Sequence, residues 1–207
     1  MYEMNVREYN EKTAKGLFRK VYPLLARQVL ERTGVDRGLC LDLGGGPGLF
    51  GIELAAISGL EVVVYDLLAE SVQVATENAA ERDLSQRVTA RQGQAENIAY
   101  EAGSVDLVIS RGSIFFWEDQ KKGLAEIHRV LKPGGWAYVG GGFGSLELLA
   151  EVMAARASEP EWNEQRKNRM QKHPPEHFAG LLTELGIPAF IESSPAGTWI
   201  SFQKTVS

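Results

Sequence analysis

The stretch Asp42-Leu-Gly-Gly-Gly-Pro-Gly48 directly follows the apolar run Leu39-Cys-Leu41. Five glycines fall between positions 44 and 51, and each costs roughly 0.5–1 kcal/mol relative to alanine inside a regular element. A tight turn from a strand into a helix, the alternative that needs no ligand, requires only one or two glycines. We therefore expect a ligand to approach this backbone closely, at the sheet edge that Asp66 also reaches by closing the next apolar run.

Short apolar runs alternate along the chain with segments of helical periodicity. The expected strands are 39–43, 62–65, 88–90, 105–109 and 136–139, and the expected helices are 49–57, 68–82 and 120–131. Two last strands, 188–192 and 198–203, are joined by a turn short enough to pair them antiparallel. This order predicts an α/β fold, with a doubly wound, mostly parallel, seven-stranded sheet, helices on both faces and a reversed C-terminal strand.

Residues 1–207 are expected to form a single domain, because no linker or composition shift divides them. Its parts are an N-terminal helical cap (1–36, with a helix over 17–33), a ligand-binding core (37–144) and a final segment of helices and the C-terminal hairpin (145–207). Within the final segment, helices are predicted over about 145–157 and from Pro174-Pro175 to near Gly186, on either side of a polar stretch.

Composition limits the possible partners. The net charge of −5 and the pI near 5.4 argue against a nucleic-acid partner, because binding the phosphate backbone requires a positive surface. No apolar stretch approaches the ~18 residues of a membrane span, and the first residues lack the order of a signal peptide. The lone Cys40 cannot form an internal disulfide, and no Cys/His cluster has metal-ligand spacing. We expect a soluble, cytoplasmic protein without a metal; the sequence does not indicate its oligomeric state.

The glycine loop fits two known patterns. Gly46-Pro-Gly48-Leu-Phe-Gly51 matches the dinucleotide pattern G-x-G-x-x-G, with Asp66 placed 20 residues after Gly46 as a ribose-binding acid. In a dinucleotide fold, however, the first glycine of the pattern follows the strand immediately, whereas here Gly44 and Gly45 come first. The second pattern, acidic-x-Gly-x-Gly-x-Gly, is matched in full by Asp42, Gly44, Gly46 and Gly48.

On that second pattern the chain resembles the class I S-adenosylmethionine-dependent methyltransferases. Gly93–Glu96, Ser104–Ser110 and Glu126–Gly135 are similar to later segments of the same family, so the resemblance covers about residues 39–144. It is closest to small, functionally uncharacterised members that share Ser110–Asp119 and Gly140–Gly144. The resemblance implies a Rossmann-like methyltransferase that binds S-adenosyl-L-methionine, releases S-adenosyl-L-homocysteine and acts on a small-molecule acceptor that it does not identify.

The resemblance also implies roles for single residues. Asp66 would accept hydrogen bonds from the ribose hydroxyls, and Asp42 would orient the loop, reach the methionine amino group through water, or only cap loop amides. The loop glycines and the residue after Asp66 would contact the cofactor; they are Gly44, Gly45, Gly46, Gly48 and Leu67. Gln94 stands where the family usually has the Asp that binds the adenine amino group, and its carbonyl can accept the same bond. Ala95 would offer its backbone N–H to the ring.

Further candidates lie at the end of the fourth predicted strand and in the N-terminal cap. Ser110 and Arg111 stand next to the topological switch point, and Arg111 could bind a carboxylate of methionine, a carboxylate of the acceptor, or a surface acid. Tyr22 is a candidate contact because the N-terminal helix often closes over the cofactor in this family. His128 is expected to be a packing residue. The basic run 165–173 is interpreted as a solvated helix face, with attraction of an anionic acceptor as the alternative.

The predicted reaction is an in-line methyl transfer that proceeds mainly through proximity and orientation. No general base is evident, which favours an acceptor that is soft or easily ionised, and the sequence leaves the catalytic residues unassigned. Two alternatives stay open. One is a nicotinamide-dependent oxidoreductase that uses Gly46, Gly48 and Gly51, and the other is a module that binds S-adenosylmethionine without catalysis.

Overall fold

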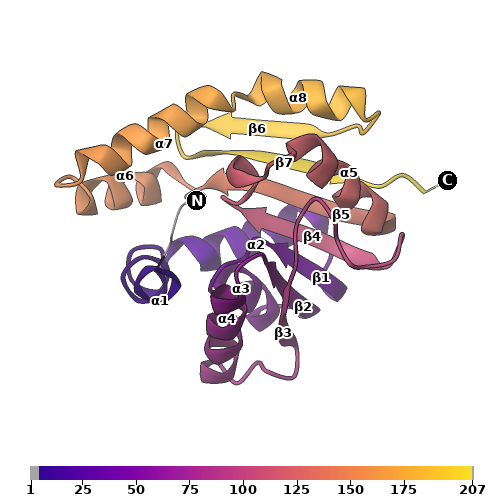
Figure 1. Ribbon diagram of the computed structural model, residues 1–207, viewed down its shortest axis with the longest axis horizontal. Helices are drawn as coiled ribbons and strands as arrows, with labels where there is room; N and C mark the ends of the chain where they lie inside the picture. Colours follow the sequence, from indigo (N-terminus) through magenta and orange to yellow (C-terminus); the bar gives the residue numbers. More distant parts are fainter. Residues whose placement is uncertain (1–4, 207) are drawn as a thin grey trace.

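A computed structural model describes residues 5–206 and contains one seven-stranded sheet with the order β3-β2-β1-β4-β5-β7-β6 (Figure 1). Residues 1–4, on which the localisation prediction partly rests, and residue 207 lie outside the described residues. The strands are β1 (Arg37–Leu43), β2 (Gly59–Asp66), β3 (Val88–Gln92), β4 (Val105–Arg111), β5 (Leu131–Gly142), β6 (Phe190–Ser194) and β7 (Gly197–Gln203).

The first five strands are parallel, and β7 pairs antiparallel with both β5 and β6. The predicted fold class is therefore confirmed. The strand order reverses at β1, which lies between β2 and β4 with Leu43 opposite Tyr65 and Asp42 opposite Ile109. In parallel sheets, ligands collect outside the carboxyl ends of the strands at such a switch point. The topology thus brings the ends of β1, β2 and β4 to one edge.

Helices cover both faces of the sheet (Figure 1). One core packs under α2 (Val21–Thr33), α3 (Leu49–Ala56) and α4 (Ala69–Glu81), and the other under α5 (Gln120–Val130) and α8 (Pro175–Glu184). The remaining helices lie near the carboxyl edge or before α2; they are α1 (Val6–Glu8), the π-helix η1 (Tyr9–Leu17), the 3₁₀ turn η2 (Ile114–Phe116), α6 (Leu146–Ala155) and α7 (Pro160–Lys172).

The structure corrects the predicted elements in three places. The helix expected over 17–33 begins at Val21, because the π-helix η1 occupies the preceding residues, and the sixth strand lies two residues later than predicted. The polar stretch after α6 contains α7, a helix of 13 residues with Pro160 at its first position and no buried residue. Most of the basic run 165–173, predicted as a solvated helix face, lies on this helix; its start at Pro160 was not predicted, because a helix without a buried face leaves no apolar periodicity in the sequence. Within residues 5–206, no helix has both the length and the apolarity to cross a membrane.

Candidate functional site

The glycine loop after β1 packs tightly at Gly44 and leaves an unfilled space at Gly46. Gly44 and Gly46 have φ angles of +60° and +55°, in the left-handed region that side chains rarely adopt. A Cβ atom built on Gly44 would lie 2.2 Å from Cβ of Ser113, whereas one built on Gly46 would meet no atom within 4 Å. Gly46 is itself buried, so the loop rests on the β4 end of the sheet and leaves an unfilled space beside the Gly46 backbone.

Asp66 holds this loop to the end of β2. Its carboxylate is buried, and Oδ2 accepts a hydrogen bond from the Gly46 N–H at 2.8 Å while Oδ1 accepts one from the Leu68 N–H at 3.0 Å. An ionised carboxylate has about four acceptor positions, so both oxygens retain capacity for a ligand. The neighbouring Leu67 side chain is 56% exposed and extends along the same edge.

Asp42 lies under the loop with one oxygen unsatisfied. Its side chain is buried, and Oδ2 accepts a hydrogen bond from the Gly51 N–H at 2.9 Å, so it binds the first turn of α3 and not an amide of the glycine loop. Oδ1 is buried without a partner among the described residues. Burial raises the pKa of Asp42 to about 7, the Gly51 hydrogen bond opposes that rise, and the charge of Asp66 adds to it. A buried polar atom without a partner is costly, so Oδ1 is the atom here that a ligand or water would satisfy.

Ser110 has a structural connection that the sequence did not predict. Its hydroxyl is buried and lies 2.7 Å from the Ser113 hydroxyl, which donates to the Leu43 carbonyl at 2.9 Å. The Trp117 indole N–H donates to the same Ser113 oxygen at 3.2 Å. This network joins the end of β4 to the end of β1. The Ser110 hydroxyl is thus engaged within the protein, beneath the site that it was expected to contact.

Arg111 and Tyr22 do come together, in an aromatic cluster. The Arg111 guanidinium carbon lies 4.4 Å from the Phe18 ring centroid, 5.3 Å from that of Tyr22 and 5.8 Å from that of Phe143. Burial raises the pKa of Tyr22 well above its ordinary value, and the charge of Asp42 contributes while that of Arg111 opposes the rise. Tyr22 and Arg111 are therefore neighbours at the end of β4.

Gln94 and Ala95 form a tight turn beside the end of β2. The Gly93 N–H donates to the Asp66 carbonyl at 2.9 Å, which anchors the turn there, and the Gln94 side chain is exposed. Glu96 instead accepts a hydrogen bond from the Glu118 N–H at 2.8 Å, so it supports the segment that leads into α5. The turn thus lies at the carboxyl edge beside the end of β2, with β2 between it and the strand that carries the glycine loop.

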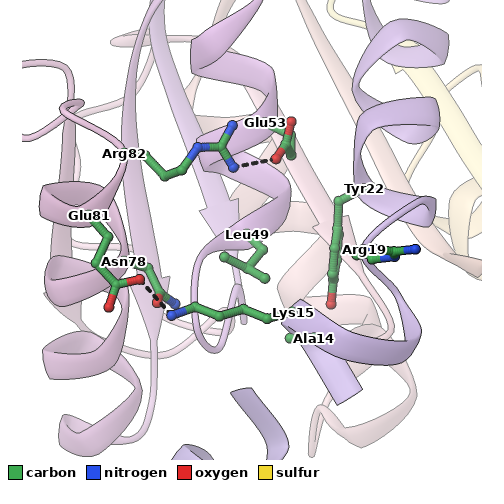
Figure 2. A pocket seen from close by; sticks show the side chains of 9 residues that line it. All are labelled: Ala14, Lys15, Arg19, Tyr22, Leu49, Glu53, Asn78, Glu81 and Arg82. Atoms are coloured by element: carbon green, nitrogen blue, oxygen red, sulfur yellow. Dashed lines mark hydrogen bonds and ion pairs between the residues drawn. The ribbon is translucent and has the colours of Figure 1, made fainter. Parts of the chain in front are cut away.

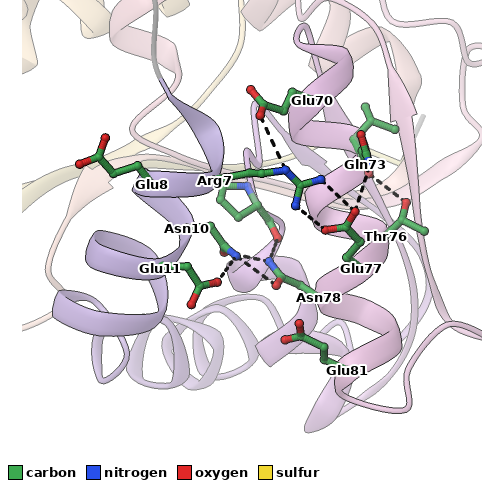
Figure 3. Close-up of polar contacts among 12 residues, drawn as sticks. Arg7, Glu8, Asn10, Glu11, Glu70, Gln73, Thr76, Glu77, Asn78 and Glu81 are labelled. Carbon is green, nitrogen blue, oxygen red and sulfur yellow. Dashed lines mark hydrogen bonds and ion pairs between the residues drawn. The ribbon is translucent and has the colours of Figure 1, made fainter.

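The sequence did not predict the polar contacts that fasten the N-terminal segment over the loop (Figure 3). The buried Asn78 side chain on α4 donates to Asn10 Oδ1 at 2.9 Å and to the Pro47 carbonyl at 2.8 Å. Beside it, Arg7 makes a bidentate pair with Glu77, with N–O distances of 2.9 and 3.0 Å. One asparagine thus joins the π-helix, α4 and the loop. Such residues are brought together only by the tertiary fold, and no local sequence signal marks them.

A cavity of about 310 Å³ lies between the N-terminal segment and the helices α3 and α4 (Figure 2). Tyr22 and Asn78 both line it, and two ion pairs border it, Lys15 with Glu81 at 2.6 Å and Arg82 with Glu53 at 2.7 Å. Four of its charged side chains are therefore already paired with one another, and Arg19 also lines it. The cavity separates the N-terminal segment from α3, so contact between the two is incomplete beside the glycine loop.

Two other expectations concern residues away from this edge. The His128 ring lies 6.3 Å from that of Phe202, and burial lowers the pKa of His128, in agreement with a packing role. Among residues 5–206, no group of three or more His, Cys, Asp or Glu side chains is arranged to hold a metal ion.

Comparisons with known proteins agree with this geometry. A family model described as a methyltransferase domain matches residues 41–139. A crystal structure from Methanococcus maripaludis, provisionally assigned as an S-adenosyl-L-methionine-dependent methyltransferase, has a TM-score of 0.92 and 35% identity, and the match covers 100% of this chain and 98% of that one.

Curated relatives match over shorter stretches. The uncharacterised protein YafE of Escherichia coli is 43% identical over 74 residues, which is 36% of this chain and 35% of YafE. The demethylmenaquinone methyltransferase of Chlorobaculum tepidum is 33% identical over 114 residues, which is 55% of this chain and 44% of that enzyme. The chain thus spans less than half the length of these two relatives.

Proposed function

This chain belongs to the class I S-adenosylmethionine-dependent methyltransferases, and we propose that it transfers the methyl group of that cofactor to a small organic acceptor. The observation that carries the proposal is the buried Asp42 carboxylate, whose Oδ1 has no partner directly beneath the glycine loop. A relative of similar sequence over 55% of this chain is named for the acceptor demethylmenaquinone, which supports an organic acceptor that is not a macromolecule.

The residues present fit the cofactor. The buried Gly46 has unfilled space beside its backbone, Asp66 retains acceptor capacity for hydroxyl groups, and Asp42 Oδ1 can accept from an ammonium group directly or through water. The turn at Gln94 and Ala95 stands one strand further along, where it would meet the base. The proposal thus assigns the amino-acid end to the β1 loop, the sugar to Asp66 and the adenine to the segment after β3.

The protein's contribution to the chemistry is positioning. When bound, S-adenosylmethionine supplies a methyl group on a sulfonium, and its C–S electron pair stays on sulfur while an acceptor lone pair forms the new bond to carbon. Orientation of two reactants can supply up to ~7–11 kcal/mol of barrier reduction. Phe18, Tyr22 and Phe143 surround the end of β4 with apolar surface, which would exclude water from the reacting groups.

Calorimetry on nucleotide-free protein tests the proposal. We expect saturable binding of S-adenosylhomocysteine and no heat with NADH. Asp66→Ala should weaken that binding at least tenfold, about 1.4 kcal/mol, because it removes the carboxylate that holds Gly46 and faces the sugar. Glu61→Ala removes an exposed carboxylate from the same strand and should leave the affinity unchanged.

An assay with S-adenosylmethionine that carries a labelled methyl group then tests whether the protein catalyses transfer as well as binding the cofactor. Transfer of the label to a small-molecule fraction of a cell extract is the expected result. Clean saturation by NADH in place of the sulfur nucleoside would contradict the cofactor assignment. Tight binding without any label transfer would leave only a binding module and contradict the proposed activity.

A further inference from the structure

Two arginines from separate elements flank the Phe143 ring. Arg111 is the last residue of β4 and Arg166 lies on α7, and both guanidinium carbons lie 5.8 Å from the Phe143 ring centroid. Phe143 directly follows β5, so the three residues meet at the carboxyl edge of the sheet. In Figure 1, α6 and α7 lie at the end of the sheet to which the arrowhead of β5 points.

Neither arginine has an acidic partner. Within the part of the chain that the structure describes, no carboxylate lies within 4.0 Å of either guanidinium, whereas Arg7, Arg82 and Arg129 are ion-paired. Arg111 donates one hydrogen bond to the Gly142 carbonyl at 3.0 Å, and Arg166 donates one to the Pro195 carbonyl at 2.7 Å. A guanidinium carries five N–H donors, so most donors of both groups are available to a ligand.

Contacts with aromatic rings compensate these two charges only in part. Both side chains are half-buried, and a partly desolvated charge is costly unless an opposite charge compensates it. Burial alone lowers the pKa of Arg166. The chain has 27 acidic and 22 basic residues. Acidic side chains are therefore abundant, yet no described carboxylate lies within 4.0 Å of either guanidinium. A bound anion would supply the missing compensation.

Aromatic rings beside the two arginines indicate the character of the rest of the ligand. The Phe143 ring lies 5.8 Å from that of Phe18 and 6.4 Å from that of Trp162, so an aromatic surface adjoins the two cations. Deepening the proposed function, on which it rests, we propose that the methyl acceptor is a small acid whose oxyanion binds Arg111 and Arg166 and whose apolar body packs on the Phe143 cluster. Part of the basic run 165–173 then has a binding role.

The test uses the full chain saturated with S-adenosylhomocysteine and three probes of nearly equal size, which are benzoate, phenyl phosphate and the neutral benzamide. We expect saturable calorimetric binding of at least one of the two anions, at least tenfold tighter than benzamide. Arg111→Gln and Arg166→Gln should each weaken that anion at least tenfold, and Arg166→Lys should weaken it less. Lys167→Gln removes one exposed charge from the same helix and should change the affinity less than twofold.

Several outcomes would overturn the inference. Equal binding of benzamide and both anions, or unchanged anion affinity in Arg166→Gln, would show that the two arginines do not form an anion site. If Arg111→Gln weakened S-adenosylhomocysteine and left the anions unaffected, Arg111 would serve the cofactor instead. Failure of the proposed function gives a different result, since the wild-type protein would then not bind S-adenosylhomocysteine at all.

Discussion

The two sides of the carboxyl edge are built in different ways. On the β1–β2 side, the loop at Gly44–Gly48 lies against side chains that leave no room for a Cβ at Gly44. Asp66 accepts from the Gly46 N–H of the loop, and Asp42 accepts from the Gly51 N–H in the first turn of α3. On the β5 side, α7 has no buried residue and is held through the ends of long side chains, such as the Arg166 contact with the Pro195 carbonyl.

Because they are built differently, the two sides should tolerate substitutions to different degrees. A site made of backbone at fixed dihedral angles tolerates almost no substitution, which suits a ligand that never changes. A site made of side-chain ends on an exposed helix can be altered one residue at a time with little cost to folding. We therefore expect substitutions on the β1–β2 side to affect stability and cofactor binding together, and those on the α7 side to affect acceptor binding alone.

The largest effect is expected from Gly44→Ala. The new Cβ would require a left-handed φ of +60° and would meet the Ser113 side chain at 2.2 Å, so we expect a loss of about 3–5 kcal/mol in the free energy of unfolding from backbone strain and overpacking. Gly103→Ala is the matched control, because its φ is +69° and its Cβ meets nothing within 4 Å. Urea unfolding of both variants measures the difference, and equal losses would show that the loop is not tightly packed.

The next effect depends on pH and concerns Asp42. The native pKa of about 7 lies above the ordinary 3.8, so between pH 4 and 7 the unfolded chain releases a proton that the folded protein keeps. Stability contributed by this group therefore falls as pH rises through that window and is level above it. Each pKa unit corresponds to about 1.4 kcal/mol, so the fall is at most about 4 kcal/mol.

Asp42→Asn cannot ionise but keeps an oxygen that can accept from Gly51. We expect the variant to lack this fall, so its stability relative to wild type should improve steadily from pH 4 to pH 7. Urea unfolding at a series of pH values checks the difference between the two proteins, in which other titrating groups cancel. Parallel curves would mean that Asp42 is ionised with little penalty, and the orphaned oxygen would then be solvated.

The same contrast explains how much the sequence could predict. Each parallel strand and the position of the glycine loop follow from apolar runs and glycine spacing, which are local signals. Asn78 and Phe143 could not be identified in this way, because their partners Asn10 and Arg166 are distant in the sequence. The sequence predicted a solvated helix face over 165–173 but neither the start of α7 at Pro160 nor the contact of Arg166 with Phe143, since an exposed helix needs no apolar stripe.

The smallest effect on folding is expected from Trp162→Leu on α7. Trp162 is half-buried and contacts the edge of the site through Phe143, at a ring distance of 6.4 Å, so we expect a loss of about 1 kcal/mol or less. Phe50→Leu in α3, directly after the glycine loop, changes a ring that is 2% exposed and should cost at least twice as much, because its neighbours cannot relax to fill the space.

Ligand binding should separate the same two variants in the opposite sense. Trp162→Leu should weaken an anionic acceptor probe while S-adenosylhomocysteine affinity stays at the wild-type value, since α7 contributes no residue to the proposed cofactor contacts. Phe50→Leu should weaken S-adenosylhomocysteine, because α3 begins at Leu49 immediately after the loop and carries the Gly51 N–H that binds Asp42. If both variants lost the two ligands equally, the edge would behave as one cooperative site, and the division into a backbone-built side and a side-chain-built side would be wrong.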